Sequence, residues 1–292
     1  MTERKRTERE REDLIEAEEL GQGLHAANLV VLDVRFDLAD PTAGERAYRE
    51  GHIPGAVFLD LERDLAAPRG PHGGRHPLPT VQHLEAVFGR AGVGPASEVV
   101  VYDEDGMYAP HAWWLLRYLG HDRVRVLNGG LNAWRTLGLP LETQVPRVEA
   151  RRFVAHPHTE WVAEREEVEH LGKDRILIDA RAPERYRGEY EPIDPRAGHI
   201  PDAVNAFWKE GLDDEGRWRG AEEQKRRFAF AEGAREIIAY CGSGVTACSD
   251  LFALHLAGRT GRVYHGSFSD WASYPDLPVI AESGKSEGTR NV

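Results

Sequence analysis

The stretch "AYCGSGVTACSDLFALHLAG" (239–258) decides the fold, because it has the pattern of a strand end, a glycine-rich loop and a helix. The stretch "VYDEDGMYAPHAWWLLRYLG" (101–120) aligns with it without a gap. Four blocks repeated in one order indicate a duplicated domain. The other three pairs are "LVVLDVR" (29–35) with "ILIDARA" (176–182), "GHIPGAV" (51–57) with "GHIPDAV" (198–204), and "NGGLNAW" (128–134) with "HGSFSDW" (265–271).

Each half alternates short apolar runs with amphipathic segments, which predicts an α/β fold of two tandem domains. In each domain we expect a mainly parallel sheet with helices on both faces, because buried parallel strands are continuous apolar runs. The predicted N-terminal domain covers 13–140 and the C-terminal domain 159–281. Two prolines that flank charged residues mark 141–158 as the linker. The expected strands cover 28–35, 98–104, 123–129, 175–181, 236–242 and 261–267.

The charge balance argues against nucleic acid as a partner. Lys and Arg number 37 and Asp and Glu 49, a net charge of −12, so an anionic substrate must be held by a local cluster of cations. No uncharged apolar run reaches the length of about 18 residues that a membrane span requires. Residues 1–14 lack the apolar stretch of a signal peptide, so we expect a solvated lead-in and a cytoplasmic protein. The polar segment 281–292 is expected to be disordered.

The chain has two cysteines, Cys241 and Cys248, only seven positions apart. This count argues against a disulfide framework, and no Cys/His cluster with zinc spacing accompanies them, so we expect no metal site. Cys248 falls at the packing period of the helix expected after the loop, which favours a place in the core. Cys241 opens the glycine-rich loop, between the expected strand and the expected helix.

The position of Cys241 suits a sulfur nucleophile. Ligand sites of open α/β sheets gather at the carboxyl ends of strands, and a helix N-terminus adds backbone N–H donors. Gly242 and Gly244 let the loop curl so that these N–H groups point at the sulfur and stabilise its thiolate form. From the loop alone, a buried cysteine that only packs is the alternative. Asp103 occupies the aligned position in the first half, where an acidic loop would repel an anion, so we expect that half to be inactive.

These motifs resemble those of the rhodanese superfamily, specifically its tandem-domain sulfurtransferases. The resemblance rests on "GHIPGAV", "IDARAPERYRGE" (178–189), "CGSGVTA" (241–247) and "VYHGSFSDW" (263–271). It implies two rhodanese domains, an inactive first one and a second one whose Cys241 takes a sulfane sulfur as a persulfide, with the active site at their interface. It also implies a small anionic donor, a thiol, thioredoxin or cyanide as acceptor, and no cofactor. A duplicated domain makes a monomer the expected state.

The resemblance assigns the donor site residue by residue. Arg185 matches the arginine that contacts the donor anion. Ile193 stands where mercaptopyruvate enzymes place a second arginine, and Arg196 is the predicted replacement. The loop "CGSGVT" is of the mercaptopyruvate type, so we expect 3-mercaptopyruvate as donor, with thiosulfate, or a persulfide carrier for protein partners, as alternatives. The loop residues expected to hold the donor are Gly242, Ser243, Gly244, Val245 and Thr246.

A proton relay is also implied by the resemblance. It would join Ser243 to His52, with Asp40 or Glu45 as the acidic partner. A structural role for His52 is nearly as well favoured, and a structural role is expected for His199, its counterpart in the second half.

The segment 68–79, "PRGPHGGRHPLP", is rich in glycine, proline and histidine. The favoured interpretation is a surface loop; the alternative is a loop that crosses to the second domain and brings Arg75 to its site. The sequence argues against a phosphatase of this fold, because Ala247 stands where a phosphate-binding arginine is needed.

Overall fold

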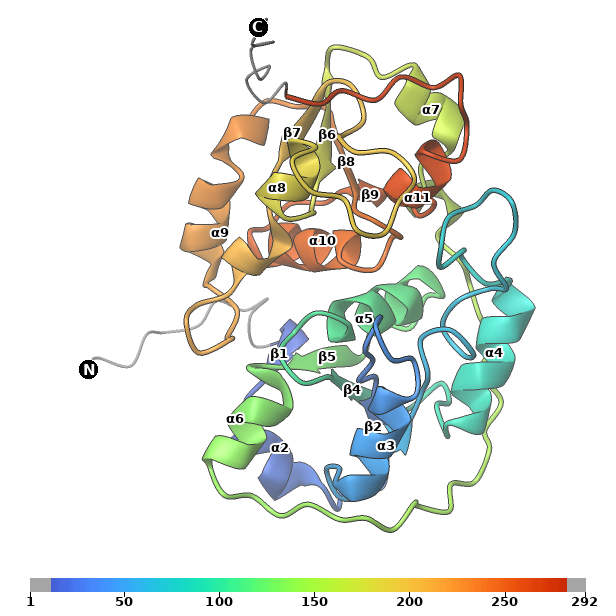
Figure 1. Ribbon diagram of the computed structural model, residues 1–292. Coiled ribbons are helices and arrows are strands. Elements are labelled where there is room, and N and C mark those ends of the chain that lie inside the picture. Colours follow the sequence, from blue (N-terminus) through green and yellow to red (C-terminus); the bar gives the residue numbers. More distant parts are fainter. Residues whose placement is uncertain (1–11, 283–292) are drawn as a thin grey trace, which may run out of the picture.

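The computed structural model describes residues 12–282 and contains two parallel sheets, one in each half (Figure 1). The first has the order β1-β5-β4-β2-β3 and the second the order β7-β6-β8-β9. The predicted α/β fold is confirmed, and all six expected strands are present. The strands are β1 (Leu14–Ile15), β2 (Leu29–Asp33), β3 (Val57–Phe58), β4 (Glu98–Tyr102), β5 (Val124–Leu127), β6 (Arg175–Asp179), β7 (Ala203–Asn205), β8 (Glu236–Tyr240) and β9 (Arg262–Val263).

Helices cover both faces of each sheet, and the strands accordingly have buried side chains on both faces. Along β4, Val99 and Val101 join one buried cluster while Val100 and Tyr102 join another, because successive side chains point to opposite faces. The helices are α2 (Ala17–Gly23), α3 (Ala43–Glu50), α4 (Val81–Arg90), α5 (Ala109–Tyr118), α6 (Gly130–Thr136), α7 (Arg165–Glu169), α8 (Pro183–Tyr186), α9 (Ala221–Arg227), α10 (Ala247–Leu256) and α11 (Ser267–Trp271), with short 3₁₀ helices at Thr159–Trp161, Trp208–Gly211 and Ala229–Ala231.

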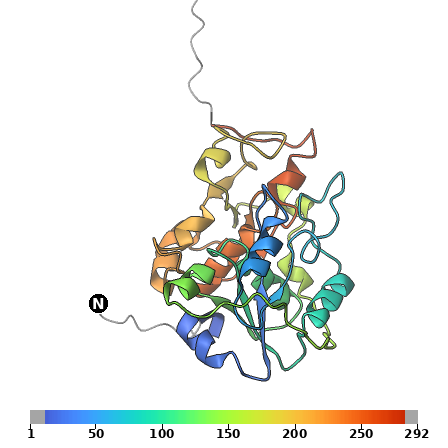
Figure 2. The ribbon, with the colours of Figure 1, turned by 60° about the horizontal axis from the view of Figure 1, so that its bottom comes forward.

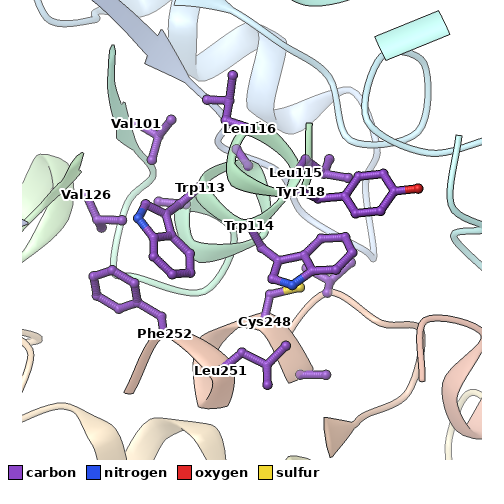
Figure 3. Close-up of a cluster of buried hydrophobic side chains, with 14 of the residues drawn as sticks. Val101, Trp113, Trp114, Leu115, Leu116, Tyr118, Val126, Cys248, Leu251 and Phe252 are labelled. Carbon is purple, nitrogen blue, oxygen red and sulfur yellow. The ribbon is translucent and has the colours of Figure 1, made fainter. Parts of the chain in front are cut away.

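The two domains share one hydrophobic core where α5 packs against α10 (Figure 3). Both helices are buried along almost their whole length, because each lies between its own sheet and the other domain. The rings of Trp113 and Phe252 meet edge to face with centroids 4.8 Å apart. Cys248 lies in the same cluster, which confirms its predicted place in the core. The shared core therefore holds the first domain close to the carboxyl ends of the strands of the second sheet.

The chain between the domains runs along the outside of the N-terminal domain, past α4 (Figure 1). Backbone bonds hold it there: the Arg151 amide donates to the Gly89 carbonyl at 2.9 Å, and the His158 amide donates to the Tyr118 carbonyl at 2.8 Å. The connection is thus part of the packed structure.

The two ends of the chain differ in part from expectation. Leu14, predicted to belong to a solvated lead-in, is buried in β1 and pairs with Val126 of β5. Residues 1–11 and 283–292, where the rest of the lead-in and most of the disordered tail were predicted, lie outside the described residues. Within 12–282, no helix is both long and apolar enough to cross a membrane.

Candidate active site

Cys241 follows β8 directly, at the carboxyl edge of the second sheet, and α10 begins six residues later. Its side chain is buried, and the Gly244 amide donates a hydrogen bond to Sγ at 3.2 Å. Gly244 has φ +86°, and a Cβ there would lie 2.4 Å from the His265 carbonyl oxygen. Only glycine fits this conformation and this contact. The curled loop predicted around the sulfur is therefore set by Gly244.

Cys241 lines a cavity of about 1130 Å³ between the domains. Of the five loop residues expected to hold the donor, Gly242, Ser243, Val245 and Thr246 line it too, and Gly244 does not. Much of the remaining wall is apolar and comes from both domains. That part includes Phe36, Ala66, Met107 and Tyr108 of the first domain and Phe207 and Trp208 of the second.

Arg185, in the short helix α8, lines the cavity, and its contact with the donor anion stays a prediction. Its guanidinium donates to Glu191 at 2.8 Å and to Asp194 at 3.0 Å, and both carboxylate side chains are buried. The pKa of Glu191 is lowered although burial opposes this, because Arg185 and backbone N–H groups bond to its carboxylate. These contacts hold the Arg185 guanidinium in place beside the Cys241 loop.

Segment 68–79 crosses to the second domain and lies beside α11 (Figure 1 and Figure 2). The Gly73 amide donates to Asp270 at 2.7 Å, and the Arg75 amide donates to Ser269 Oγ at 2.9 Å. The Arg75 guanidinium reaches the cavity and donates to Asp194 at 2.9 Å. The favoured interpretation of a surface loop was wrong, and the alternative is correct.

The same segment supplies the partner of Ser243. The Ser243 hydroxyl lies 2.8 Å from Nδ1 of His76, and both side chains are buried. Burial lowers the pKa of His76 to about 3, with a further contribution from the positive charge of Arg75, so its ring is neutral at neutral pH. Its Nε2 lies 3.8 Å from Glu62 Oε1. A neutral imidazole held in this way can accept the serine proton.

His52 lies elsewhere, so the predicted Ser243–His52 pairing is not formed. Nδ1 of His52 bonds to the Tyr48 carbonyl at 2.7 Å, and its ring stacks on Tyr48. Its Nε2 lies 3.7 Å from Glu142, whereas Asp40 or Glu45 was the expected partner. His199 repeats the arrangement in the second half, bonded to the Tyr186 carbonyl and stacked on the Tyr186 ring. The paired geometry supports a structural role for both histidines.

The sequence did not point to His76, because His52 and His199 lie in a repeated motif and His52 was taken as the relay partner of Ser243. The only local signal was the composition of 68–79, in which Arg75 had been noticed and His76 had not. His76 is distant from Ser243 in the sequence, and no spacing rule connects them.

Two further predictions concern Arg196 and Cys248. Arg196 donates to the Tyr274 carbonyl at 3.2 Å and does not line the cavity, which leaves Ile193, a cavity residue, without the expected cationic replacement from this segment. Cys248 donates to the Gly244 carbonyl at 3.3 Å. Burial, reinforced by the neighbouring Cys241, raises the pKa of the Cys248 thiol well above its usual range. Its thiol therefore stays protonated.

No described residue offers a site for a metal ion. Within 12–282, no group of three or more His, Cys, Asp or Glu side chains is arranged to hold one. The chemistry available at the cavity is that of a sulfur nucleophile with cations and a serine–histidine pair beside it.

Comparison with known proteins identifies the family. The family model of the rhodanese-like domain matches residues 16–137 and 163–274. A Pseudomonas aeruginosa protein named "Probable 3-mercaptopyruvate sulfurtransferase" is 45% identical over 275 residues, which cover 91% of this chain and 97% of that protein. "Thiosulfate sulfurtransferase" of Rattus norvegicus is 33% identical over 283 residues, which cover 92% of this chain and 94% of the rat protein.

A solved structure agrees with this family. SseA from Escherichia coli, whose structure is described under the "Rhodanese" fold of 3-mercaptopyruvate sulfotransferases, is 30% identical. The two superpose with a TM-score of 0.74, over 88% of this chain and 98% of that one. Two matched domains, these relatives and a shared fold lead to one conclusion. The chain belongs to the rhodanese-like family and is a sulfurtransferase.

Proposed function

We propose that the chain moves a sulfane sulfur from 3-mercaptopyruvate to a thiophilic acceptor through a persulfide on Cys241. The observation that carries this proposal is that Cys241, the guanidinium groups of Arg75 and Arg185, and the Ser243–His76 pair all line one cavity. The reaction needs a sulfur nucleophile, cations for an anionic donor and a group that can pass a proton. The printed name of the P. aeruginosa relative supports the choice of donor.

In the first step the Cys241 thiolate attacks the sulfur of 3-mercaptopyruvate. A bond forms between the two sulfurs, and the bond between sulfur and the methylene carbon breaks with its electron pair on the carbon. The resulting enolate of pyruvate gains a proton at that carbon, while the persulfide loses the proton that its outer sulfur carried. The products are pyruvate and the Cys241 persulfide anion.

The side chains around Cys241 have separate parts in this step. Arg185 would bind the donor carboxylate by charge-assisted hydrogen bonds. The Ser243 hydroxyl, bonded to the neutral ring of His76, would donate a hydrogen bond to the enolate oxygen as negative charge develops on it. The pair would also carry the proton that moves from sulfur to carbon. In this proposal His76 takes the part that the sequence had assigned to His52.

The outer sulfur of the persulfide would meet backbone N–H groups at the start of α10. Thr246 and Ala247 stand at this helix N-terminus, where the first amides have no partner within the helix. Such donors favour a negative charge on sulfur. In the second step the acceptor thiolate attacks the outer sulfur, and Cys241 leaves as thiolate. A small thiol, reduced thioredoxin or cyanide would serve as acceptor.

The test compares two donors on the same protein: pyruvate release from 3-mercaptopyruvate and thiocyanate formation from thiosulfate and cyanide. We expect a higher kcat/KM with 3-mercaptopyruvate, and loss of both activities in Cys241→Ser. Cys248→Ala is the matched control and should retain them, because its thiol lies in the core. Ser243→Ala should lower the 3-mercaptopyruvate rate more than the thiosulfate rate.

Two results would contradict the proposal. Sulfur transfer by Cys241→Ser would remove Cys241 from the mechanism. A clear preference for thiosulfate, the donor in the name of the rat relative, would leave the role of Cys241 intact and replace the donor.

A further inference from the structure

We infer that a second pocket, which belongs to the first domain alone, is a binding site for a free α-amino acid in its zwitterionic form. The pocket has a volume of about 350 Å³ and lies where the chain leaves β2 and β4, beside the start of α3. We call it the first-domain pocket. The inference goes beyond the proposed function, because no residue of the Cys241 loop lines this pocket.

The first-domain pocket is the counterpart of the Cys241 cavity. Four residues of the loop after β4 line it, and the four residues at the aligned positions after β8 line the Cys241 cavity. They are Glu104, Asp105, Met107 and Tyr108 in the first loop and Gly242, Ser243, Val245 and Thr246 in the second. Ligand sites of open α/β sheets gather at this edge. The duplicated fold therefore provides a place for a ligand in both domains.

The charge of the first-domain pocket differs from that of the Cys241 loop. Glu104 and Asp105 stand where the second loop has Gly242 and Ser243, and Asp37 joins them in the lining. Glu104 is paired with Arg135. Within the described part of the chain, Asp37 and Asp105 form no ion pair. Two uncompensated carboxylates favour a ligand that carries a positive charge.

The two carboxylates converge on Tyr108. Burial raises the pKa of the Tyr108 hydroxyl, and the negative charges of Asp103, Asp37 and Asp105 raise it further. The rings of Tyr108 and Phe36 meet edge to face with centroids 5.7 Å apart, and both residues line the pocket. An ammonium group is attracted by carboxylates and by the face of an aromatic ring. This part of the pocket therefore suits an amine.

Arg35 supplies the opposite charge. Its side chain is only 3% exposed, and Asp33 accepts hydrogen bonds from its Nε and Nη2 atoms. Its Nη1 atom is buried and has no hydrogen-bond partner among residues 12–282. Glu104 Oε2 lies 3.8 Å from Nη1, too far for a hydrogen bond, while Oε1 accepts from Arg135. A fixed guanidinium with an unused donor suits a carboxylate.

The start of α3 adds to the attraction for a carboxylate. A Cβ at Gly44 would lie 2.0 Å from the Arg35 carbonyl oxygen, so glycine is needed for the helix to approach Arg35 this closely. Ala43 and Gly44 form the first turn and line the pocket. The first backbone N–H groups of a helix have no partner within it and favour a negative charge.

One ligand chemistry satisfies both parts of the pocket. A simple anion would be repelled by Asp37 and Asp105, and a simple amine would leave Arg35 Nη1 unpaired. A free α-amino acid carries an ammonium and a carboxylate on one carbon, so it can meet both. The pocket of about 350 Å³ has room for this core and a side chain.

Calorimetric titration of the full-length protein with L-alanine and with ethylamine, which lacks the carboxylate, tests the two charges. We expect L-alanine to bind about tenfold more tightly than ethylamine, the effect of one charge-assisted hydrogen bond. Asp105→Asn should weaken L-alanine binding by a similar factor. Glu62→Gln is the matched control and should leave it unchanged, because Glu62 lines the Cys241 cavity but not the first-domain pocket, whereas Asp105 lines both.

A fourth variant tests the location of the ligand. Ala47 lines the first-domain pocket and not the Cys241 cavity. Leucine is a good helix former, so Ala47→Leu should fill the pocket and abolish L-alanine binding at a melting temperature close to that of the parent. Arg185→Gln, which alters only the Cys241 cavity, should leave the binding intact.

Three results would overturn the inference. The parent protein would bind no L-alanine, or Ala47→Leu and Asp105→Asn would both bind it as tightly as the parent. In the third case Arg185→Gln would lose the binding, because the amino acid would then occupy the Cys241 cavity. None of these measurements requires sulfur transfer, so the inference and the proposed function can fail separately.

Discussion

The loops that follow β4 and β8 occupy equivalent places in the two domains, and they use the same turn in opposite ways. In the first, the Asp103 carboxylate accepts hydrogen bonds from the amides of Gly106, Tyr108 and Ala109. In the second, Cys241 Sγ accepts from the amide of Gly244. In both domains the turn directs backbone N–H donors at the first side chain of the loop, an arrangement that we call the cradle. In the first domain the Asp103 carboxylate occupies it.

This comparison changes the reason for expecting an inactive first domain. The acidic loop was predicted to repel an anion, but Asp103 is buried and occupies the cradle itself. Met107 and Tyr108 of the same loop line the cavity between the domains into which Cys241 faces. The first domain thus contributes a wall to the site, and the segment carrying Arg75 and His76 contributes polar groups to it.

The largest effect should come from the glycine that shapes each loop. Gly244→Ala places a Cβ 2.4 Å from the His265 carbonyl oxygen, so we expect kcat/KM for the donor to fall at least about a hundredfold as the cradle opens. Gly106 has a similar φ of +93°, but a Cβ there would meet only side-chain atoms, those of Leu212 at 3.5 Å and of Trp218 at 4.0 Å. Gly106→Ala should cost about 1 kcal/mol of stability and leave turnover nearly unchanged. Donor kinetics and urea unfolding of both variants check this, and equal losses of turnover would break the comparison.

A smaller effect concerns His265, packed under the Cys241 loop. Burial lowers its pKa to about 4, from an ordinary value of 6.5. The unfolded chain therefore binds a proton that the folded chain does not, and the folded state loses about 1.4 kcal/mol per pH unit as pH falls from 6.5 towards 4. In His265→Gln this loss should be absent, so the variant gains on the parent by about 2 kcal/mol between pH 7 and pH 5. Urea unfolding at the two pH values measures it, and parallel behaviour would refute it.

The smallest effect has the opposite sign and belongs to the first loop. Burial, with the nearby charge of Asp105, raises the pKa of Asp103 to about 6 despite its backbone hydrogen bonds, from an ordinary 3.8. The folded state takes up the proton first, so this carboxyl group adds stability as pH falls through 6. Relative to Asp103→Asn, the parent should gain about 1 kcal/mol between pH 7 and pH 5. The parent is expected to lose stability relative to His265→Gln between pH 7 and pH 5. If it also lost stability relative to Asp103→Asn over this range, the assignment for Asp103 would be contradicted.

The sequence predicted those features that repeat or that follow a local rule. The strands with long apolar runs were all found, and Asp202 shows how robust the repeat is. It adopts φ +62°, close to the +78° of Gly55 at the equivalent turn, because aspartate tolerates the left-handed region better than most residues. The turn therefore survives the loss of its glycine. The short strands β1, β3 and β7 were missed, because two or three residues cannot show a period. The strand β9 has only two residues as well, and it was predicted because its segment takes the place of β5 in the repeat.

The sequence predicted a site residue only where that residue lies in a segment with a recognisable motif. Cys241, its loop and Arg185 lie on segments with recognisable motifs. His76 and the bridge from Arg75 to Asp194 depend on a loop of one domain reaching the other, and no periodicity records such a contact. The sequence offered the path of 68–79 across the interface only as an alternative, and the structure shows that the segment takes it.

The shared core has a consequence for how the protein is made. On the ribosome the first domain is complete before α10 has been synthesised, so the face of α5 that bears Trp113 and Trp114 has no partner for that time. Exposed aromatic surface on a nascent chain invites aggregation or chaperone binding. Translation speed between the two halves, and the chaperones that meet the first one, should therefore influence the yield of active protein.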